Sequence, residues 1–108
     1  MTLTDFLGDT AEMRIIDFLG EHIRYDYSIS QIAEYTGLSR TTVYDKIPKL
    51  EENNVVKKVR TVGRSEMFRL ANNELTKTLE RVALTHSLIM AGDEKPKEVM
   101  KELAKALA

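Results

Sequence analysis

The chain has 108 residues, of which 43% are hydrophobic and 31% are charged, as in a globular domain with one modest core. It contains no cysteine, which excludes disulfides and thiolate metal sites. No apolar run approaches the roughly 20 residues that span a bilayer, and residues 1–8 lack the basic and apolar stretches of a signal peptide. We therefore expect a cytoplasmic protein without membrane contact.

The net charge of −1 is divided unevenly along the chain. Residues 1–38 hold two basic and seven acidic side chains, whereas residues 39–69 hold eight basic and four acidic ones. Residues 70–108 hold six of each. Positive charge is thus confined to the middle segment, which favours a polyanionic partner there.

The first predicted helix runs from about Thr10 to Arg24, where Asp9 and Glu12 have the spacing of a capping pair. Apolar residues recur in it at helical spacing. They are Met13, Ile15, Ile16, Leu19 and Ile23. A polar and aromatic link follows, and a short strand could end it.

A helix-turn-helix is predicted next. Ser30 can cap a short helix to about Tyr35, and Gly37 can supply the positive φ of a tight turn. Ser39 can cap a further helix, which two asparagines, Asn53 and Asn54, would end. The buried stripe of this helix would be Val43, Ile47 and Leu50.

The second half of the chain predicts a hairpin and two helices. Residues 55–59 and 66–70 have the composition of strands, and the basic segment 60–65 between them would form the tip. A long helix is expected from about Asn73 to Ala91, with a last one from near Pro96 to near Leu107. The expected fold is therefore mainly α with a small β-hairpin wing. We assign residues 1–72 to a winged helix-turn-helix domain and residues 73–108 to a C-terminal helical dimerisation segment.

The stretch from Ile32 to Tyr44 has a small residue, a turn glycine, an apolar residue after the turn and a buried residue early in the second helix. These are Ala33, Gly37, Leu38 and Val43. The stretch resembles the core of MarR/ArsR-like winged helix transcriptional regulators, and residues 49–56 resemble the helix end and first wing strand of such proteins. The resemblance covers about residues 10–70, and it implies binding to double-stranded DNA.

If the stripe from Val43 to Leu50 faces inward, the opposite face of the helix is polar and lies near the helix N-terminus, as insertion into a major groove requires. The candidate DNA-binding residues of the recognition helix are Ser39, Arg40, Thr41, Thr42, Tyr44, Asp45 and Lys49. Those of the wing, on the backbone or in the minor groove, are Lys57, Lys58, Arg60 and Arg64.

Each assignment has a simpler alternative. Ser39 could only cap its helix, the threonines could be solvated surface, and Tyr44 could cover the edge of the domain. The lysines and Arg60 could protect an edge strand from aggregation. Pro48 should bend the recognition helix, which leaves the role of Lys49 open. Asp45 could accept a hydrogen bond from cytosine, but we expect it to orient Arg40 or Lys49.

The C-terminal half predicts a dimer. Apolar residues of the long helix recur with a period of 3.5, and together with Leu103 they would pair with a second copy. The seam residues are Leu75, Leu79, Val82, His86 and Ile89. The alternative is packing against the N-terminal helix of the same chain.

We expect no enzyme, cofactor or metal, because the two histidines have no cysteine near them and no phosphate-cradling loop or nucleophile motif is present. The sequence therefore predicts a homodimeric, nucleoid-associated transcriptional regulator that binds a specific DNA sequence. A DNA-organising or plasmid-maintenance protein, or a winged helix used for protein–protein contacts, remain alternatives. The eight basic residues of segment 39–69 argue against the last of these.

Overall fold

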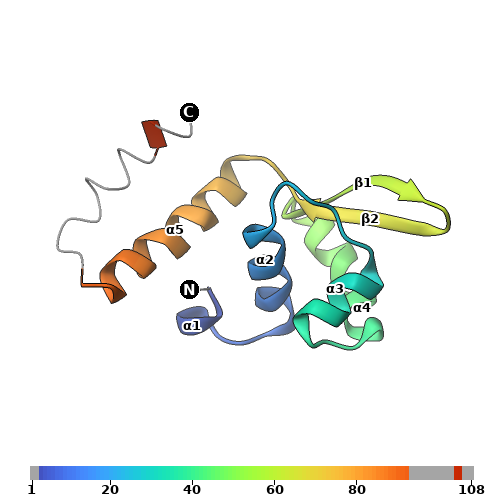
Figure 1. Cartoon of the computed structure of the whole chain (residues 1–108), viewed down its shortest axis with the longest axis horizontal. Coiled ribbons are helices and arrows are strands. Elements are labelled where there is room, and N and C mark those ends of the chain that lie inside the picture. Colours follow the sequence, from blue (N-terminus) through green and yellow to red (C-terminus); the bar gives the residue numbers. More distant parts are fainter. Residues whose placement is uncertain (1–2, 93–103, 106–108) are drawn as a thin grey trace.

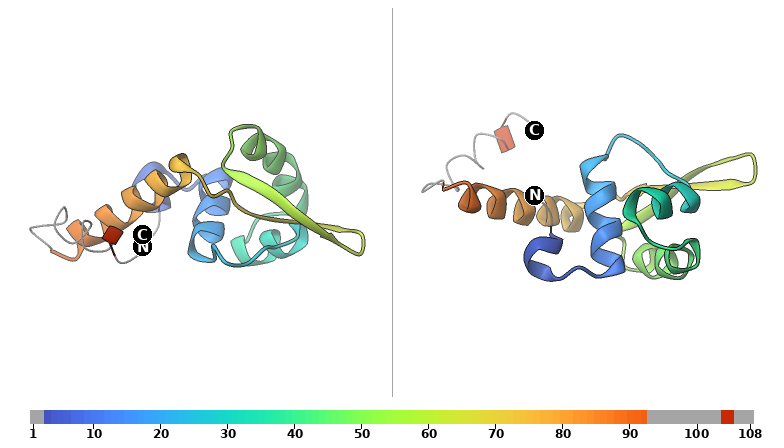
Figure 2. Two further views of the ribbon diagram at one scale, coloured as in Figure 1. Left: turned by 90° about the horizontal axis from the view of Figure 1, so that it is seen from above. Right: turned by 60° about the horizontal axis from the view of Figure 1, so that its bottom comes forward.

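The computed structural model describes residues 3–92 and 104–105 (Figure 1). The elements in chain order are α1 (Thr4–Leu7), α2 (Ala11–Glu21), α3 (Ile29–Thr36), α4 (Arg40–Glu52), β1 (Val56–Val62), β2 (Ser65–Leu70) and α5 (Glu74–Met90). The two strands form an antiparallel hairpin that projects from one end of the molecule, and α5 extends toward the opposite end (Figures 1 and 2). The predicted fold class, a winged helix-turn-helix followed by a C-terminal helix, is confirmed. Within the described residues, no helix is both long and apolar enough to cross a bilayer.

Helix α2 is shorter than the pattern predicts, and a different residue caps it. Thr10, not Asp9, accepts a hydrogen bond from the backbone N–H of Met13. Asp9 instead holds Arg14 through two hydrogen bonds of 2.6 and 2.8 Å. This bidentate pair competes with capping, because both carboxylate oxygens are already used by the guanidinium. The helix ends at Glu21, three residues before the predicted end.

Helix α3 also begins earlier than predicted. Ser28, not Ser30, is the N-cap, and its side chain accepts from the backbone N–H of Gln31. The Gln31 side chain in turn accepts from the backbone N–H of Ser28, which completes a capping box. The helix ends at Thr36, and its C-cap Gly37 has a φ of 73°, which is left-handed as predicted.

Helix α4 agrees with the sequence prediction at both ends. Ser39 is its N-cap, and Asn54, with a φ of 60°, takes the left-handed conformation just beyond the helix. The helix continues through Pro48 to Glu52. The three residues predicted to form its buried stripe are at most 6% exposed, and they are Val43, Ile47 and Leu50.

The hairpin strands reach farther than predicted, so the wing is longer and its turn tighter. Val62 pairs with Ser65, which leaves only Gly63 and Arg64 in the turn. Gly63 has a φ of 60°, as a two-residue hairpin turn requires. The link before α3 also pairs with β2 through an isolated antiparallel bridge, in which Tyr27 and Phe68 exchange two backbone hydrogen bonds of 2.8 Å.

The hydrophobic core lies where α2, α3 and α4 meet the base of the hairpin. Its buried members are Ile15, Leu19, Ile32, Ala33, Val43, Ile47, Leu50, Val55, Val56, Phe68 and Leu70. Because α2, α3, α4, β1 and β2 all contribute to it, the three helices and the hairpin base form one packed unit. This unit fixes the direction in which the outer face of α4 points.

Helix α5 follows the predicted boundaries to within a residue. Asn73 and Thr76 form a capping box, and the Thr76 hydroxyl donates to the carbonyl of Ala71 at 2.6 Å. Thr76 is 2% exposed, so this bond joins the helix start to the end of the hairpin. The last helix, predicted from near Pro96 to near Leu107, lies outside the described residues.

The sequence pattern does not predict α1. The backbone N–H groups at its start, of Leu3 and Thr4, donate to the two carboxylate oxygens of Asp17 at 2.8 and 3.0 Å. The ring of Phe6 lies 4.3 Å from that of His86 on α5, measured between ring centroids. A single turn of helix is marginal in isolation, so these tertiary contacts stabilise it.

The glycine between α3 and α4 tests how tightly this turn is specified. Gly37→Ala should lower the free energy of unfolding by about 1–2 kcal/mol, because an alanine resists the left-handed conformation. Gly20→Ala is the matched control: Gly20 is helical and its added methyl group meets open space. We expect Gly20→Ala to raise the free energy of unfolding by about 0.5–1 kcal/mol, since alanine is more stable than glycine within a helix. Urea unfolding measures both, and equal effects would contradict the assigned turn.

Candidate nucleic-acid interface

The outer face of α4 carries the polar residues that the sequence assigns to DNA. Arg40, Thr41, Tyr44, Asp45 and Lys49 are all exposed. The buried stripe of the same helix packs into the core, so this outer face is directed away from the domain. The structure therefore brings the residues predicted for the recognition helix together on one surface.

Ser39 acts as a cap. Its hydroxyl accepts from the backbone N–H of Thr42 at 3.0 Å and donates to the Thr42 hydroxyl at 2.8 Å. Ser39 is exposed and Thr42 is half-buried. The capping interpretation thus holds, and the Thr42 hydroxyl keeps its own proton available for another acceptor.

Tyr44 and Asp45 decide two of the alternatives. Tyr44 is 70% exposed, so it does not cover the edge of the domain. Within residues 3–92 and 104–105, no ion pair or hydrogen bond joins the Asp45 carboxylate to Arg40 or Lys49. The expectation that Asp45 orients one of these cations is wrong, because the carboxylate extends into solvent instead.

The four cations predicted for the wing lie in different environments. Arg64 lies in the exposed hairpin turn. Lys58 pairs with Glu66 across the hairpin, with 3.3 Å between the ammonium and a carboxylate oxygen. Arg60 makes a bidentate pair with Asp26, at 2.7 and 3.1 Å. The hydrogen bonds from Arg60 hold the pKa of Asp26 below its ordinary value, and Arg69 adds a smaller effect of the same sign.

Arg69 is a cation that the sequence reasoning missed. It is exposed on β2 and lies directly opposite Lys57 on β1. Like charges directly opposite one another destabilise a hairpin, so this pair favours an anion over its surface. The signal was present in the sequence: Arg69 alternates with the buried Phe68 and Leu70, which puts it on the outer face.

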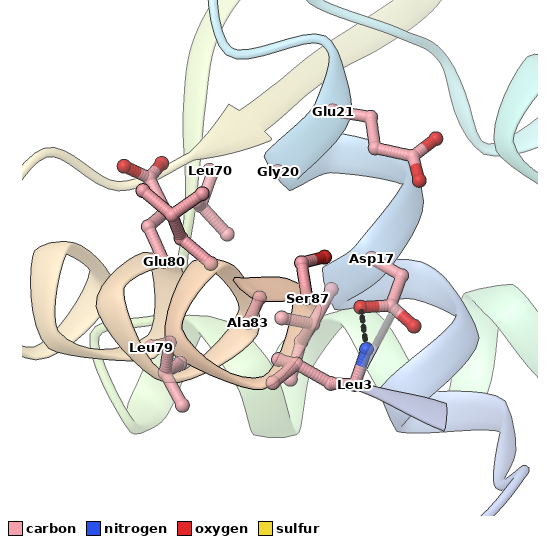
Figure 3. Close-up of a pocket in the computed structure, with 11 residues that line it drawn as sticks. Leu3, Asp17, Gly20, Glu21, Leu70, Leu79, Glu80, Ala83 and Ser87 are labelled. Carbon is pink, nitrogen blue, oxygen red and sulfur yellow. Dashed lines mark hydrogen bonds between the residues drawn. The ribbon is translucent and has the colours of Figure 1, made fainter. Parts of the chain in front are cut away.

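A cleft of about 350 Å³ lies between α5 and α2 and is open to solvent (Figure 3). Its lining is Leu3, Ile16, Asp17, Gly20, Glu21, Leu70, Leu79, Glu80, Ala83, Leu84 and Ser87. Partial burial raises the pKa of Glu80. Because the only ionisable groups of this lining are carboxylates, the cleft is unsuited to a phosphate. Among the described residues, no group of three His, Cys, Asp or Glu side chains is placed to hold a metal ion.

The residues predicted for a dimer seam fall on more than one surface of α5. Leu75, Val82 and Ile89 are 38–55% exposed, whereas Leu79 lines the cleft toward α2. The ring of His86 packs against that of Phe6 of its own chain, with the two planes tilted by 32°. Leu103 lies outside the described residues. Part of the predicted seam is thus covered within the chain. Leu75, Val82 and Ile89 form an apolar ridge on α5 that remains exposed to solvent.

A sequence profile of the family described as "Putative helix-turn-helix protein, YlxM / p13 like" matches residues 2–89. No curated protein sequence is similar enough to count as a match.

Solved structures share the fold at low identity. A homodimeric winged helix-turn-helix DNA-binding domain from Mycobacterium bovis, described as a possible ArsR-family transcriptional regulator, is 19% identical, with a TM-score of 0.66 over 82% of this chain and 78% of that one. A mutant of ZitR from Lactococcus lactis is 18% identical, with a TM-score of 0.61 over 99% and 80%. MepR, a transcription regulator of the Staphylococcus aureus multidrug efflux pump MepA, is 21% identical, with a TM-score of 0.58 over 97% and 82%. The predicted likeness to ArsR- and MarR-type folds is confirmed.

The cap of α4 can be tested without DNA. Ser39→Ala should lower the free energy of unfolding by about 0.5–2 kcal/mol, because a backbone N–H loses its acceptor. Ser39→Asp should keep the wild-type value, since aspartate is as good a cap and its charge favours a helix N-terminus. Chemical denaturation compares the three proteins. An alanine variant with the wild-type free energy of unfolding would show that the Ser39 hydroxyl does not stabilise the helix.

Proposed function

The chain belongs to the YlxM/p13-like family of helix-turn-helix proteins, and we propose that it binds double-stranded DNA as a homodimer and regulates transcription. In this proposal α4 enters the major groove and the wing lies on the backbone or in the minor groove. A protein with this role would associate with the nucleoid.

The single observation that carries the proposal is the coincidence of charge and exposure on α4 and the hairpin. Eight of the sixteen basic residues lie in segment 39–69, which carries a net charge of +4. Within residues 3–92 and 104–105, three of those eight form ion pairs: Lys46 with Glu12, Lys58 with Glu66 and Arg60 with Asp26. The other five form none within these ranges. Exposed cations without acidic partners attract a polyanion more strongly than paired ones do.

The proposed contacts divide into readout and positioning. The hydroxyls of Thr41 and Thr42 suit base edges, and Tyr44 suits a thymine methyl group or the backbone. Phosphate oxygens suit Ser39 and Arg40 of the helix and Lys57, Lys58 and Arg64 of the wing, whereas Arg60 is already paired with Asp26. The proposed DNA-contacting residues are Ser39, Arg40, Thr41, Thr42, Tyr44, Asp45, Lys49, Lys57, Lys58 and Arg64, to which we add Arg69.

The apolar ridge of α5 supports the homodimer. Its exposed members are Leu75, Val82, Ile89 and Met90, and Phe6 of α1 lies beside it against His86. A row of exposed apolar side chains on one helix is typical of an interaction surface. The related fold from Mycobacterium bovis is described as homodimeric, which favours a second copy as the partner. We assign residues 1–72 to DNA binding and 73–108 to dimerisation.

A DNA-organising or plasmid-maintenance role would use the same surfaces. The two functions differ in the number and strength of binding sites, which footprinting on genomic DNA distinguishes. A purely protein-binding role would not need the unpaired cations of α4 and the wing.

The first test of DNA binding separates positioning from readout. Arg64→Ala should weaken binding to specific and random duplexes alike and make the log–log salt slope of the dimer shallower by about 1.8, because each of the two copies loses one phosphate contact. Thr41→Ala should instead cost about 1–3 kcal/mol of discrimination between them. Fluorescence anisotropy titrations between low and physiological salt measure both quantities.

Arg24→Ala is the control for these titrations, since it removes the same charge from the exposed surface of the acidic N-terminal third. It should leave the slope unchanged. A wild-type affinity that does not depend on salt would contradict DNA binding, and equal losses on both duplexes for Thr41→Ala would contradict the recognition face.

The dimer is tested on the full chain. Val82→Glu should raise the dimer dissociation constant at least about tenfold, because an unpaired carboxylate would be buried in the interface. Val62→Glu is a matched control, since Val62 is 49% exposed near the hairpin tip and Val82 is 38% exposed on α5. Sedimentation velocity at micromolar concentration reads out the mass. A wild-type monomer, or a dimer that both variants preserve, would contradict this role for α5.

A further inference from the structure

The wing is tied to the rest of the molecule by an ion pair between residues that are far apart in sequence. Asp26 lies in the link between α2 and α3, and Arg60 lies on β1. The guanidinium Nε and Nη2 donate to the two carboxylate oxygens at 2.7 and 3.1 Å. The Asp26 side chain is 17% exposed and that of Arg60 is 62% exposed. Bidentate geometry of this kind makes an exposed pair stronger than most surface ion pairs.

A β-bulge places Arg60 within reach of Asp26. Lys58 pairs with Phe68, but Arg60 pairs with Met67, so Val59 is an extra residue on β1. Without the bulge, alternation would put Arg60 opposite Glu66 and on the same face as Lys58. The extra residue turns Arg60 to the other face, which carries Arg69. Bulges commonly redirect a side chain in this way.

The link that carries Asp26 is itself fixed. Tyr27 pairs with Phe68 through two backbone hydrogen bonds, so Asp26 lies beside Arg69 on the outer face. The Tyr27 ring also packs on that of Phe18 in α2, with 4.7 Å between centroids. The carboxylate is therefore held by the helical unit, and Arg60 is the group that reaches to it from the wing.

From this pair toward the tip, the hairpin is exposed to solvent. Residues 61–66 are all exposed, and Met67 is the last buried residue of β2 toward the tip. A two-stranded ribbon without further packing bends easily. The pair is thus the outermost tertiary contact that limits the direction of Arg64.

We propose that Asp26 and Arg60 form a strut that holds the wing at a fixed angle to α4, so that Arg60 acts on DNA binding by positioning the hairpin tip and not by contacting phosphate. This inference rests on the proposed DNA binding, and it assigns both residues a positioning role. It revises the assignment of Arg60 made from sequence, because Nε and Nη2 of its guanidinium already donate to Asp26.

The test asks whether Asp26→Asn strengthens or weakens DNA binding. If Arg60 contacts phosphate, Asp26→Asn removes a competing carboxylate from a surface that faces DNA, and binding becomes tighter. If the pair is a strut, Asp26→Asn frees the wing and weakens binding, about two- to fivefold for an exposed pair. Arg60→Gln should weaken it to the same extent with the wild-type salt slope, whereas loss of a phosphate contact in each copy of the dimer would make the slope shallower by about 1.8.

Two further variants complete the experiment. The double variant Asp26→Asn/Arg60→Gln should bind no more weakly than either single variant, because both remove the same contact. Glu66→Gln is the matched control: its carboxylate pairs with Lys58 inside the hairpin and ties nothing to the helices. This control should bind DNA as tightly as the wild type or more tightly. Thermal unfolding monitors the fold of every variant.

A readout without DNA separates the strut from the proposed function. Backbone NMR order parameters of residues 61–66 should fall in Asp26→Asn and in Arg60→Gln but not in Glu66→Gln. Unchanged order parameters in both variants, or tighter DNA binding by Asp26→Asn, would overturn the strut. If the wild-type protein binds no duplex but the order parameters of residues 61–66 fall in both variants, the DNA-binding proposal is overturned and the strut is kept.

Discussion

Burial of the inner face of α4 is the constraint on which the rest of the molecule depends. Val43 is 0% exposed and Ile47 is 1% exposed, and they pack among residues of α2, α3 and the hairpin base. Removing this apolar surface from water stabilises the domain and fixes the rotation of α4 about its own axis. Since one face is committed to the core, the opposite face, with its threonines and Arg40, is left for a partner. The candidate interface is thus a consequence of packing.

The wing depends on the same core through Phe68. This residue is 2% exposed, and its backbone pairs with Tyr27 on one side and with Lys58 on the other. The base of the hairpin is therefore rigid, while its tip extends beyond any packing. The bidentate contact between Asp26 and Arg60 lies at the boundary between these two regions. The cations of the wing therefore differ in role. Arg60 forms an ion pair within the chain, and Arg64 is exposed in the hairpin turn.

Helix α5 serves the winged domain and the proposed dimer with different faces. Thr76 joins its start to the hairpin end, and Leu79 lines the cleft toward α2. Val82 and Ile89 remain exposed on the ridge. The 3.5-residue pattern does not separate these faces, because an apolar residue gives the same signal whether it packs within the chain or against another chain. His86 illustrates this: Phe6 covers it in the structure, and the pattern assigned it to a second copy.

The sequence by itself determined the element order, the buried stripe of α4, the turn at Gly37 and the basic character of segment 39–69. These features follow from local periodicity and from conformations that few residues adopt. Only the structure decided which residues cap α2 and α3. Asp9 binds Arg14 and leaves the cap of α2 to Thr10, and Ser28 instead of the identical Ser30 forms the capping box of α3. The tertiary structure also decided the single turn of α1 and the position of Arg60. Both depend on contacts between residues distant in the chain, Asp17 with Leu3 and Asp26 with Arg60, and a one-residue bulge that no local pattern marks.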